Sequence, residues 1–177
     1  MVDNVVLDSL RTRRSIRKFK AEQITDEELT TVLEAGTWAP TGKGQQDPWI
    51  VAVQDKELMT QLARMNAAVK GIKVNPYYDA PTIVLVFGSD PAVWGNSLQD
   101  GSLVLGNMML AAHAIGLGSC WINREREMFA TAGGQELMRR LGLPDGLIGI
   151  GALSLGYPDE EPHPAKPRKK NYYRIIR

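Results

Sequence analysis

The sequence is poor in the residues that most often bind metals or form cross-links. Its 177 residues include one cysteine, Cys120, and two histidines, His113 and His163, which lie far apart in the chain. A lone cysteine cannot form an internal disulfide, and this set does not supply the four ligands of a structural zinc site. We therefore expect no metal ion. Sparse cysteine is also typical of a reducing compartment, so we expect a cytoplasmic protein.

Long apolar runs and an excess of one charge are also missing. No stretch is apolar enough to cross a membrane, and residues 1–4 lack the charged and apolar regions of a signal peptide, so we expect no membrane partner. The 21 Lys and Arg residues nearly balance the 20 Asp and Glu residues, which argues against a dedicated nucleic-acid-binding protein. With 44% hydrophobic residues, a chain of this length is expected to form one domain with a sizeable core.

Positive charge is nevertheless concentrated in one place. Residues 11–20 hold six basic side chains and no acidic one, and the rest of the chain has 15 basic and 20 acidic residues, a net charge of −5. Arginine forks around a hydroxyl group suit a doubly charged oxyanion such as a phosphate monoester, because each fork can donate two parallel hydrogen bonds. A solvated basic turn and a nucleic-acid-binding patch are the alternatives that the segment itself leaves open.

Two glycine-rich segments resemble nucleotide-binding motifs but fail their spacing. Residues 38–49 form a loop rich in glycine, proline and amides, which suits either close approach to a ligand or a plain structural loop. Within it, Gly36 is one residue too far from Gly42 for a P-loop, and Gly44 stands where Ser or Thr would bind magnesium. Residues 147–156 lack a dinucleotide fingerprint, because its third glycine position is Ser154 and no helix follows.

Apolar periodicity and end signals predict an alternation of helices and strands. Residues Thr25 and Glu28 form a capping box at the start of a helix that Gly36 is expected to end, and Asp55 is a second helix cap. Helices are expected at 5–12, 26–36, after 55, at 97–114 and at 135–141, and buried strands at 50–53, 82–87, 116–122 and 147–156. The strand at 82–87 is apolar on both faces and should be central in a covered sheet.

Two segments point to a second subunit. The helix at 97–114 is apolar almost all round, and one short chain has little material to cover it. The segment 157–170 has four prolines and alternating charges, which is typical of an extended arm. Residues 172–176 have strand propensity and could add to the sheet edge of a partner, and a frayed tail is the alternative that the sequence leaves open.

Taken together, five stretches resemble the FMN-dependent nitroreductase family. They cover almost the full chain and occur in the family's order. The stretches are 13–19, 39–42 with Gln46 and 48–49, 107–113, 116–121 and 166–168.

The resemblance implies an α+β fold with three layers, in which helices flank a central, mainly antiparallel sheet. It also implies an intertwined homodimer with FMN at the subunit interface. The expected organisation is a nitroreductase-like FMN-binding domain at 1–156 and an extended C-terminal arm at 157–177 that packs on the partner subunit.

The resemblance also implies which residues bind FMN. The N-terminal cluster and the tail would hold the phosphate and the pyrimidine side, the glycine-rich loop would come from the partner subunit, and the strand after the apolar helix would line the ring. The residues are Arg13, Arg14, Ser15, Arg17, Pro40, Thr41, Gly42, Gln46, Asn75, Cys120, Trp121, Ile122, Lys166 and Arg168.

The implied activity is a two-step electron transfer at one site. NAD(P)H would pass a hydride to flavin N5, and a nitroaromatic, quinone or similar acceptor would then take it, with no catalytic side chain. The alternatives are a flavin-dependent dehydrogenase or reductase of a specific metabolite, a non-catalytic flavin-binding protein, and a nucleic-acid binder that uses the basic cluster.

Overall fold

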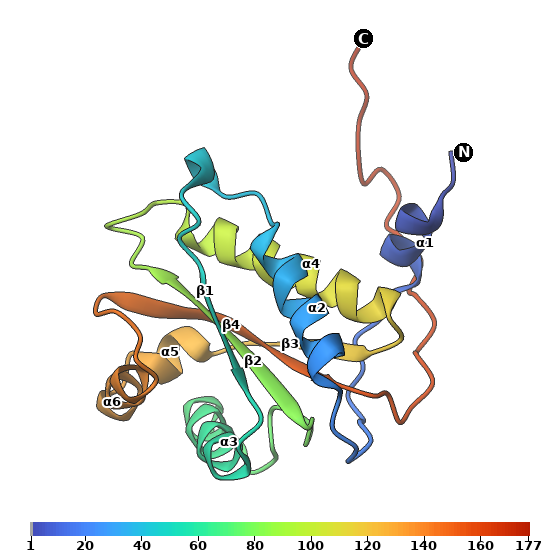
Figure 1. Ribbon diagram of the computed structural model, residues 1–177. Coiled ribbons are helices and arrows are strands. Elements are labelled where there is room, and N and C mark those ends of the chain that lie inside the picture. Colours follow the sequence, from blue (N-terminus) through green and yellow to red (C-terminus); the bar gives the residue numbers. More distant parts are fainter. Residues whose placement is uncertain (1) are drawn as a thin grey trace.

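A four-stranded sheet lies between two layers of helices in the computed structural model, which describes residues 2–177 (Figure 1). The elements are α1 (Val5–Thr12), α2 (Asp26–Thr37), the short 3-10 helix η1 (Gly42–Gly44), β1 (Trp49–Val53), α3 (Lys56–Lys70), β2 (Thr82–Ser89), α4 (Ser97–Ala114), β3 (Gly118–Ile122), α5 (Glu125–Phe129), α6 (Ala132–Arg140) and β4 (Leu147–Gly156). The strand order is β1-β2-β4-β3, and all neighbouring strands are antiparallel. The predicted α+β class and antiparallel sheet are confirmed.

Strand β2 explains the layers. Its side chains alternate between the two faces of the sheet, and all but its last residue are buried. Ile83, Leu85 and Phe87 pack in the core under α3, α5 and α6, whereas Val84 and Val86 pack in the core under α2 and α4. Because both faces are covered, β2 is apolar throughout, as the sequence predicted.

The glycines of β4 serve close packing. A Cβ atom at Gly149 would lie 2.6 Å from the backbone oxygen of Glu125, so this glycine lets α5 approach the sheet. A Cβ atom at Gly151 would lie 2.9 Å from Leu105 of α4 and 3.1 Å from Trp121. This close approach from both sides explains why β4 is rich in glycine without binding a dinucleotide.

Local end signals were predicted well. Thr25 and Glu28 form the expected capping box, and Asp55 accepts a hydrogen bond of 2.8 Å from the Leu58 backbone N–H. Helix α2 continues one residue past Gly36, which lies inside the helix because its missing side chain lets Met108 of α4 come close.

Two other details differ from the prediction. Strand β1 is at the edge of the sheet and is only half-buried, because its outer side has no neighbouring strand. Helix α5 was not predicted, since it has only five residues and its N-cap residue, Arg124, has a left-handed φ of 85° and makes no side-chain cap hydrogen bond. In the single chain residues 172–176 form no strand, and their addition to a partner's sheet edge stays a prediction.

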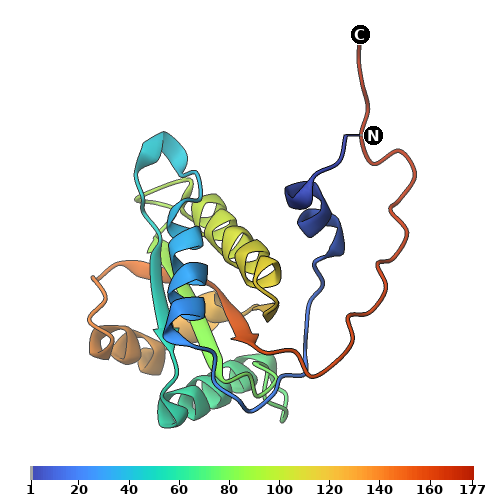
Figure 2. The same ribbon diagram turned by 45° about the vertical axis from the view of Figure 1, so that its right-hand side comes forward.

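Helix α1 and the C-terminal tail project away from the sheet and its helices (Figure 2). The predicted helix is present, but its apolar side chains Val5, Val6 and Leu10 are 79%, 63% and 54% exposed, so the single chain leaves its apolar face uncovered. The tail beyond Tyr157 is extended and largely exposed. Within residues 2–177, no helix combines the length and the hydropathy that a membrane crossing requires.

Candidate functional site

The N-terminal basic segment is fixed along the edge strand β3. Ser15 forms a parallel bridge with Ser119, and the Ile16 backbone N–H donates to the Ser119 carbonyl oxygen over 3.0 Å. The Ile16 side chain is 5% exposed and lies where a Cβ atom at Gly118 would contact it. This anchoring holds the neighbouring arginines in place and excludes a disordered basic tail.

Arg13 is the most informative member of the cluster. Its Nη1 atom is buried and has no hydrogen-bond partner among the described residues. Burial, and to a smaller extent the charge of Arg14, lowers the pKa of Arg13. A buried guanidinium nitrogen without an acceptor is costly unless an anion pairs with it, so this atom marks a place for an anionic ligand.

A small cavity lies beside Arg13. It has a volume of about 220 Å³, and its lining includes Arg13, Arg14, His113, Gly118 and Ser119. One guanidinium nitrogen of Arg14 donates to the carbonyl oxygens of Arg11 and Arg13, both over 2.7 Å. Some of the Arg14 donors are therefore already used by neighbouring backbone groups. His113 also lines this cavity, although the sequence did not predict it as a site residue. Its Nε2 atom and the Thr12 hydroxyl share a hydrogen bond of 2.8 Å.

Arg17 joins the cluster to a second loop. Its backbone N–H donates to Glu160 over 2.6 Å, and its guanidinium carbon lies 5.9 Å from the centre of the Tyr78 ring. Tyr78 has a left-handed φ of 59°, which turns the loop at 75–80 toward Arg17. The sequence reasoning missed Tyr78 because this contact depends on long-range packing.

Asn75, which was predicted to bind FMN, shapes the same loop. Its side-chain oxygen accepts from the Tyr77 backbone N–H over 2.9 Å, and its amide donates to Asp79 over 2.8 Å. The structure thus gives Asn75 a local role and leaves one amide hydrogen for a ligand.

Cys120, Trp121 and Ile122 lie in β3, beside the basic segment. Cys120 and Ile122 are both 3% exposed and face the core under α3, α5 and α6, whereas Trp121 packs on the opposite side. Burial raises the pKa of the Cys120 thiol, against the opposing effect of Arg17, so the thiol is protonated at neutral pH.

The glycine-rich loop, with η1 drawn as the short cyan helix near the top of Figure 1, lies at the other end of the sheet from the basic segment. Asp100, 3% exposed at the start of α4, accepts hydrogen bonds from the Gly42 backbone N–H over 2.9 Å and from the Trp94 indole over 2.8 Å. Thr41 accepts from the Gln46 backbone N–H over 3.0 Å. The loop is thus held in one shape, although Pro40 and Gln46 stay exposed.

Within one chain, the predicted site residues therefore lie in separate groups. Arg13, Ser15, Arg17 and Cys120 lie together, but the loop 40–46 does not reach them. Lys166 and Arg168 lie on the exposed tail, and within residues 2–177 neither has a hydrogen bond or ion pair. The sequence could have indicated Asp100, since it is a lone carboxylate in the first turn of an apolar helix.

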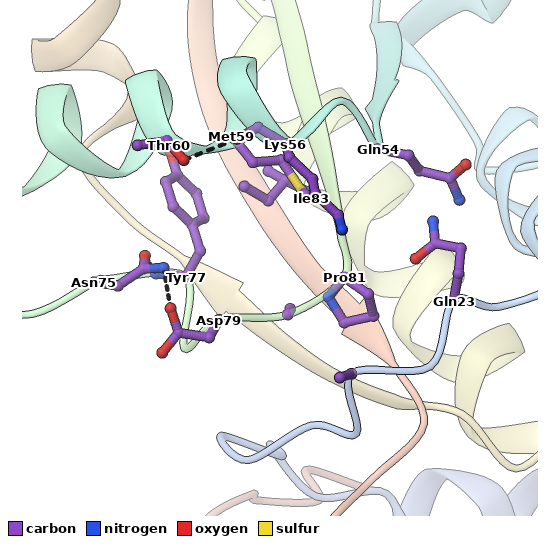
Figure 3. A pocket seen from close by; sticks show the side chains of 12 residues that line it. Gln23, Gln54, Lys56, Met59, Thr60, Asn75, Tyr77, Asp79, Pro81 and Ile83 are labelled. Atoms are coloured by element: carbon purple, nitrogen blue, oxygen red, sulfur yellow. Dashed lines mark hydrogen bonds between the residues drawn. The ribbon is translucent and has the colours of Figure 1, made fainter.

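A larger cavity lies between the N-terminal end of α3 and the loop that carries Asn75 (Figure 3). Its volume is about 670 Å³. Gln23 and Gln54 point toward each other at one side, and both amides donate to the Thr82 hydroxyl, over 3.0 and 3.1 Å. The loop separates this cavity from the basic cluster, because Tyr77 lines the cavity whereas Tyr78 contacts Arg17.

Comparison with known proteins places this fold in one family. A sequence model described as the Nitroreductase family matches residues 10–157, which include the basic segment, the glycine-rich loop and β3. The chain belongs to the nitroreductase family.

Relatives and solved structures agree with this assignment. A candidate NADH dehydrogenase/NAD(P)H nitroreductase of Archaeoglobus fulgidus is 33% identical, with 88% of this chain and 86% of the relative covered. An NADPH-flavin oxidoreductase of Vibrio harveyi is 30% identical over 93% of this chain and 70% of its own length. A crystal structure of a nitroreductase with bound FMN from Bacteroides fragilis superimposes with a TM-score of 0.90 and 27% identity, covering 99% of this chain and 100% of that one.

Because the family match ends at residue 157, it includes every predicted cofactor-binding residue except Lys166 and Arg168. Among the described residues of this nitroreductase, no group of three His, Cys, Asp or Glu side chains could hold a metal ion.

Proposed function

We propose that this protein is an FMN-dependent oxidoreductase that takes electrons from NAD(P)H and passes them to nitroaromatic compounds, quinones or similar acceptors. Membership of the nitroreductase family and similarity to an NADPH-flavin oxidoreductase support an FMN-dependent, NAD(P)H-using enzyme. The observation that carries the proposal is the buried, unpaired Nη1 atom of Arg13 beside a cavity at the basic segment.

The residues of this segment fit an FMN phosphate. A phosphate has several acceptor oxygens and two negative charges near neutral pH, and it would satisfy the unpaired Arg13 nitrogen. Arg13 and Arg17 both act electrostatically on Cys120, which places their charges near one end of β3. Ser15 lies at the same point and adds a hydroxyl donor.

A second copy of the chain would complete the site. The loop at 40–46 is rigidly held but lies away from the basic segment of its own chain. An apolar cavity of about 260 Å³ between α1 and α4 and the exposed apolar face of α1 support the packing of a partner there. We infer that a homodimer brings the loop with Pro40, Thr41, Gly42 and Gln46 to the other subunit's flavin, and that the tail at 157–177 packs on that subunit.

The protein's share in the reaction is binding and electrostatics. When bound, FMN supplies the chemistry, by accepting a hydride from NAD(P)H and giving it to the acceptor. Arg13, Arg14 and Ser15 hold the phosphate, together with Lys166 and Arg168 of the tail. Arg17 brings positive charge to the pyrimidine side, where negative charge develops on reduction. Backbone groups at Cys120, Trp121 and Ile122 line the ring, and no side chain acts as a nucleophile.

Substitution of the arginines tests the proposal. In the R13A/R17A variant, we expect FMN affinity to fall by at least 100-fold, because each charge-assisted hydrogen bond is worth about 1.5–3 kcal/mol. The R139A/R140A variant removes the same charge from α6, on the far face of the sheet, and should bind FMN like the parent protein. Equal flavin content in the three purified proteins would contradict the assignment, and yellow protein that no nicotinamide nucleotide reduces would indicate flavin storage.

A further inference from the structure

A buried polar cluster connects two segments of the proposed flavin site. Glu125, Asn66 and Tyr77 are 1%, 0% and 0% exposed. The Tyr77 hydroxyl donates to Glu125 Oε1 over 3.1 Å, and the Asn66 amide donates to the same oxygen over 3.0 Å. Figure 3 shows the Tyr77 side chain pointing from its loop toward α3, the helix that carries Asn66.

The cluster reaches both segments directly. Asn66 also donates to the backbone oxygen of Asn123 over 2.9 Å, and Asn123 directly follows β3, whose end is assigned to the flavin ring. Tyr77 belongs to the loop that places Tyr78 against Arg17, and its carbonyl oxygen accepts a 2.9 Å bond from buried Ser154 of β4. The geometry of one cluster therefore sets the positions of the β3 end and of this loop.

Two atoms of the cluster lack partners. Glu125 Oε2 and Asn66 Oδ1 are both buried and have no hydrogen bond among the described residues. Both atoms are acceptors when Glu125 is ionised, so neither can satisfy the other. A proton on Glu125 would turn one acceptor into a donor and remove a buried charge.

The surroundings favour this proton. Burial raises the pKa of Glu125 to about 7, despite the opposing effects of its hydrogen bonds and of Lys70 on α3. Tyr77 is the only titratable side chain bonded to it among residues 2–177, and burial raises the pKa of Tyr77 well above its usual value, so Tyr77 stays protonated. On α5 itself, Arg124, Arg126 and Glu127 are exposed.

We propose that Glu125 is a positioning residue, which in its protonated form holds the β3 end and the Tyr77 loop in the arrangement that binds FMN. This inference rests on the proposed function. Ionisation of Glu125 places a charge in the core, which is relieved when the N-terminal end of α5 opens toward water and Asn123 moves with it. FMN binding and protonation of Glu125 therefore strengthen each other, as linkage requires.

Titration of apoprotein with FMN across the pH range tests the inference. We expect the dissociation constant of the parent protein to rise by roughly five- to tenfold between about pH 6 and about pH 8.5, since a tenfold change corresponds to one unit of pKa difference between the free and bound states. In E125Q, the amide has a donor group and an acceptor oxygen in place of those of the protonated acid and carries no charge, so affinity should stay high and independent of pH. The matched control E127Q changes an exposed glutamate of the same helix and should keep the parent's pH dependence.

A second variant keeps the inference testable if E125Q does not fold. Y77F removes a hydrogen bond that lowers the pKa of Glu125, so the loss of FMN affinity should move to higher pH. A merely structural role predicts a uniform loss of affinity at every pH in both variants, and that result would overturn the inference, as would a flat profile for the parent protein.

Apoprotein spectroscopy separates this inference from the proposed function. Infrared spectra near neutral pH should contain the carbonyl band of a protonated carboxylic acid, and this band should be missing in E125Q. If the band is present but FMN binds to none of the proteins, the proposed function is wrong and the positioning role with it. If FMN binds and the band is absent, only the positioning role is wrong.

Discussion

The carboxylate of Asp100 offers the sharpest test of how the glycine-rich loop is held. Asp100 is 3% exposed and connects the Gly42 backbone N–H to the Trp94 indole N–H. The contact is tight, because a Cβ atom at Gly42 would lie 2.7 Å from the Trp94 ring and would also overlap Asn96. Replacement by alanine leaves two donors without an acceptor, and replacement by asparagine leaves one oxygen for two donors.

The size of the effect follows from these two bonds. Hydrogen bonds to a charged group contribute about 1.5–3 kcal/mol each. Because the Gly42 and Trp94 donors are only part-buried, water can replace some of the lost interaction, so the lower end of this range applies. We expect D100A to lower the free energy of unfolding by about 3 kcal/mol and D100N by about half as much.

Urea denaturation followed by circular dichroism and tryptophan fluorescence measures this change. The control is D90A, because the Asp90 side chain accepts a single exposed bond, from the Ala92 backbone N–H over 2.8 Å, and should cost less than about 1 kcal/mol. FMN affinity of D100A should also fall, since Gly42 belongs to the proposed flavin loop. A free energy of unfolding of D100A within about 1 kcal/mol of the parent protein's would refute this account, because D100A would then be no less stable than the control D90A.

Three further predictions concern the core. The pKa of Glu125 is raised from 4.5 to about 7 in the folded state, so its contribution to the free energy of unfolding should be fully present below about pH 4.5 and should fall by about 3 kcal/mol as the pH rises through about 7. Thermal melts at several pH values check this, and E125Q should show a smaller pH dependence than the parent protein. Leu62→Ala, at a side chain with no exposure, should cost about 2–5 kcal/mol in chemical denaturation, and a loss below 1 kcal/mol would disprove its assignment to the core. In Gly134→Ala, the new Cβ would lie 2.5 Å from the Phe129 Cα and against the Met128 oxygen, so the melting temperature should drop markedly, whereas Gly133→Ala, with open space around it, should not.

Sequence patterns predicted the elements whose signals are local. Thr25, Glu28 and Asp55 act on backbone groups within three residues, so helix starts could be placed from the chain alone. The apolar residues on both faces of β2 and around α4 likewise indicate burial, which could be inferred from each element without knowledge of its neighbours. The edge position of β1 was missed, because its burial depends on which strand lies beside it.

The site was predictable only in part, for the same reason. Arginines close together in sequence stayed close in space, so the basic cluster could be placed without a structure. The contacts of Tyr78 with Arg17 and of Asp100 with Gly42 join residues that are distant in sequence, and no local pattern records them. The contribution of Lys166 depends on a second subunit and stays a prediction.

Anaerobic titration of the purified protein, reconstituted with equimolar FMN, tests the central claim most directly. The account predicts a tightly bound yellow flavin whose visible absorbance is bleached by NADH or NADPH and restored by a nitroaromatic compound or a quinone. Flavin that separates from the protein on a desalting column, or bound flavin that neither nucleotide bleaches, would contradict it.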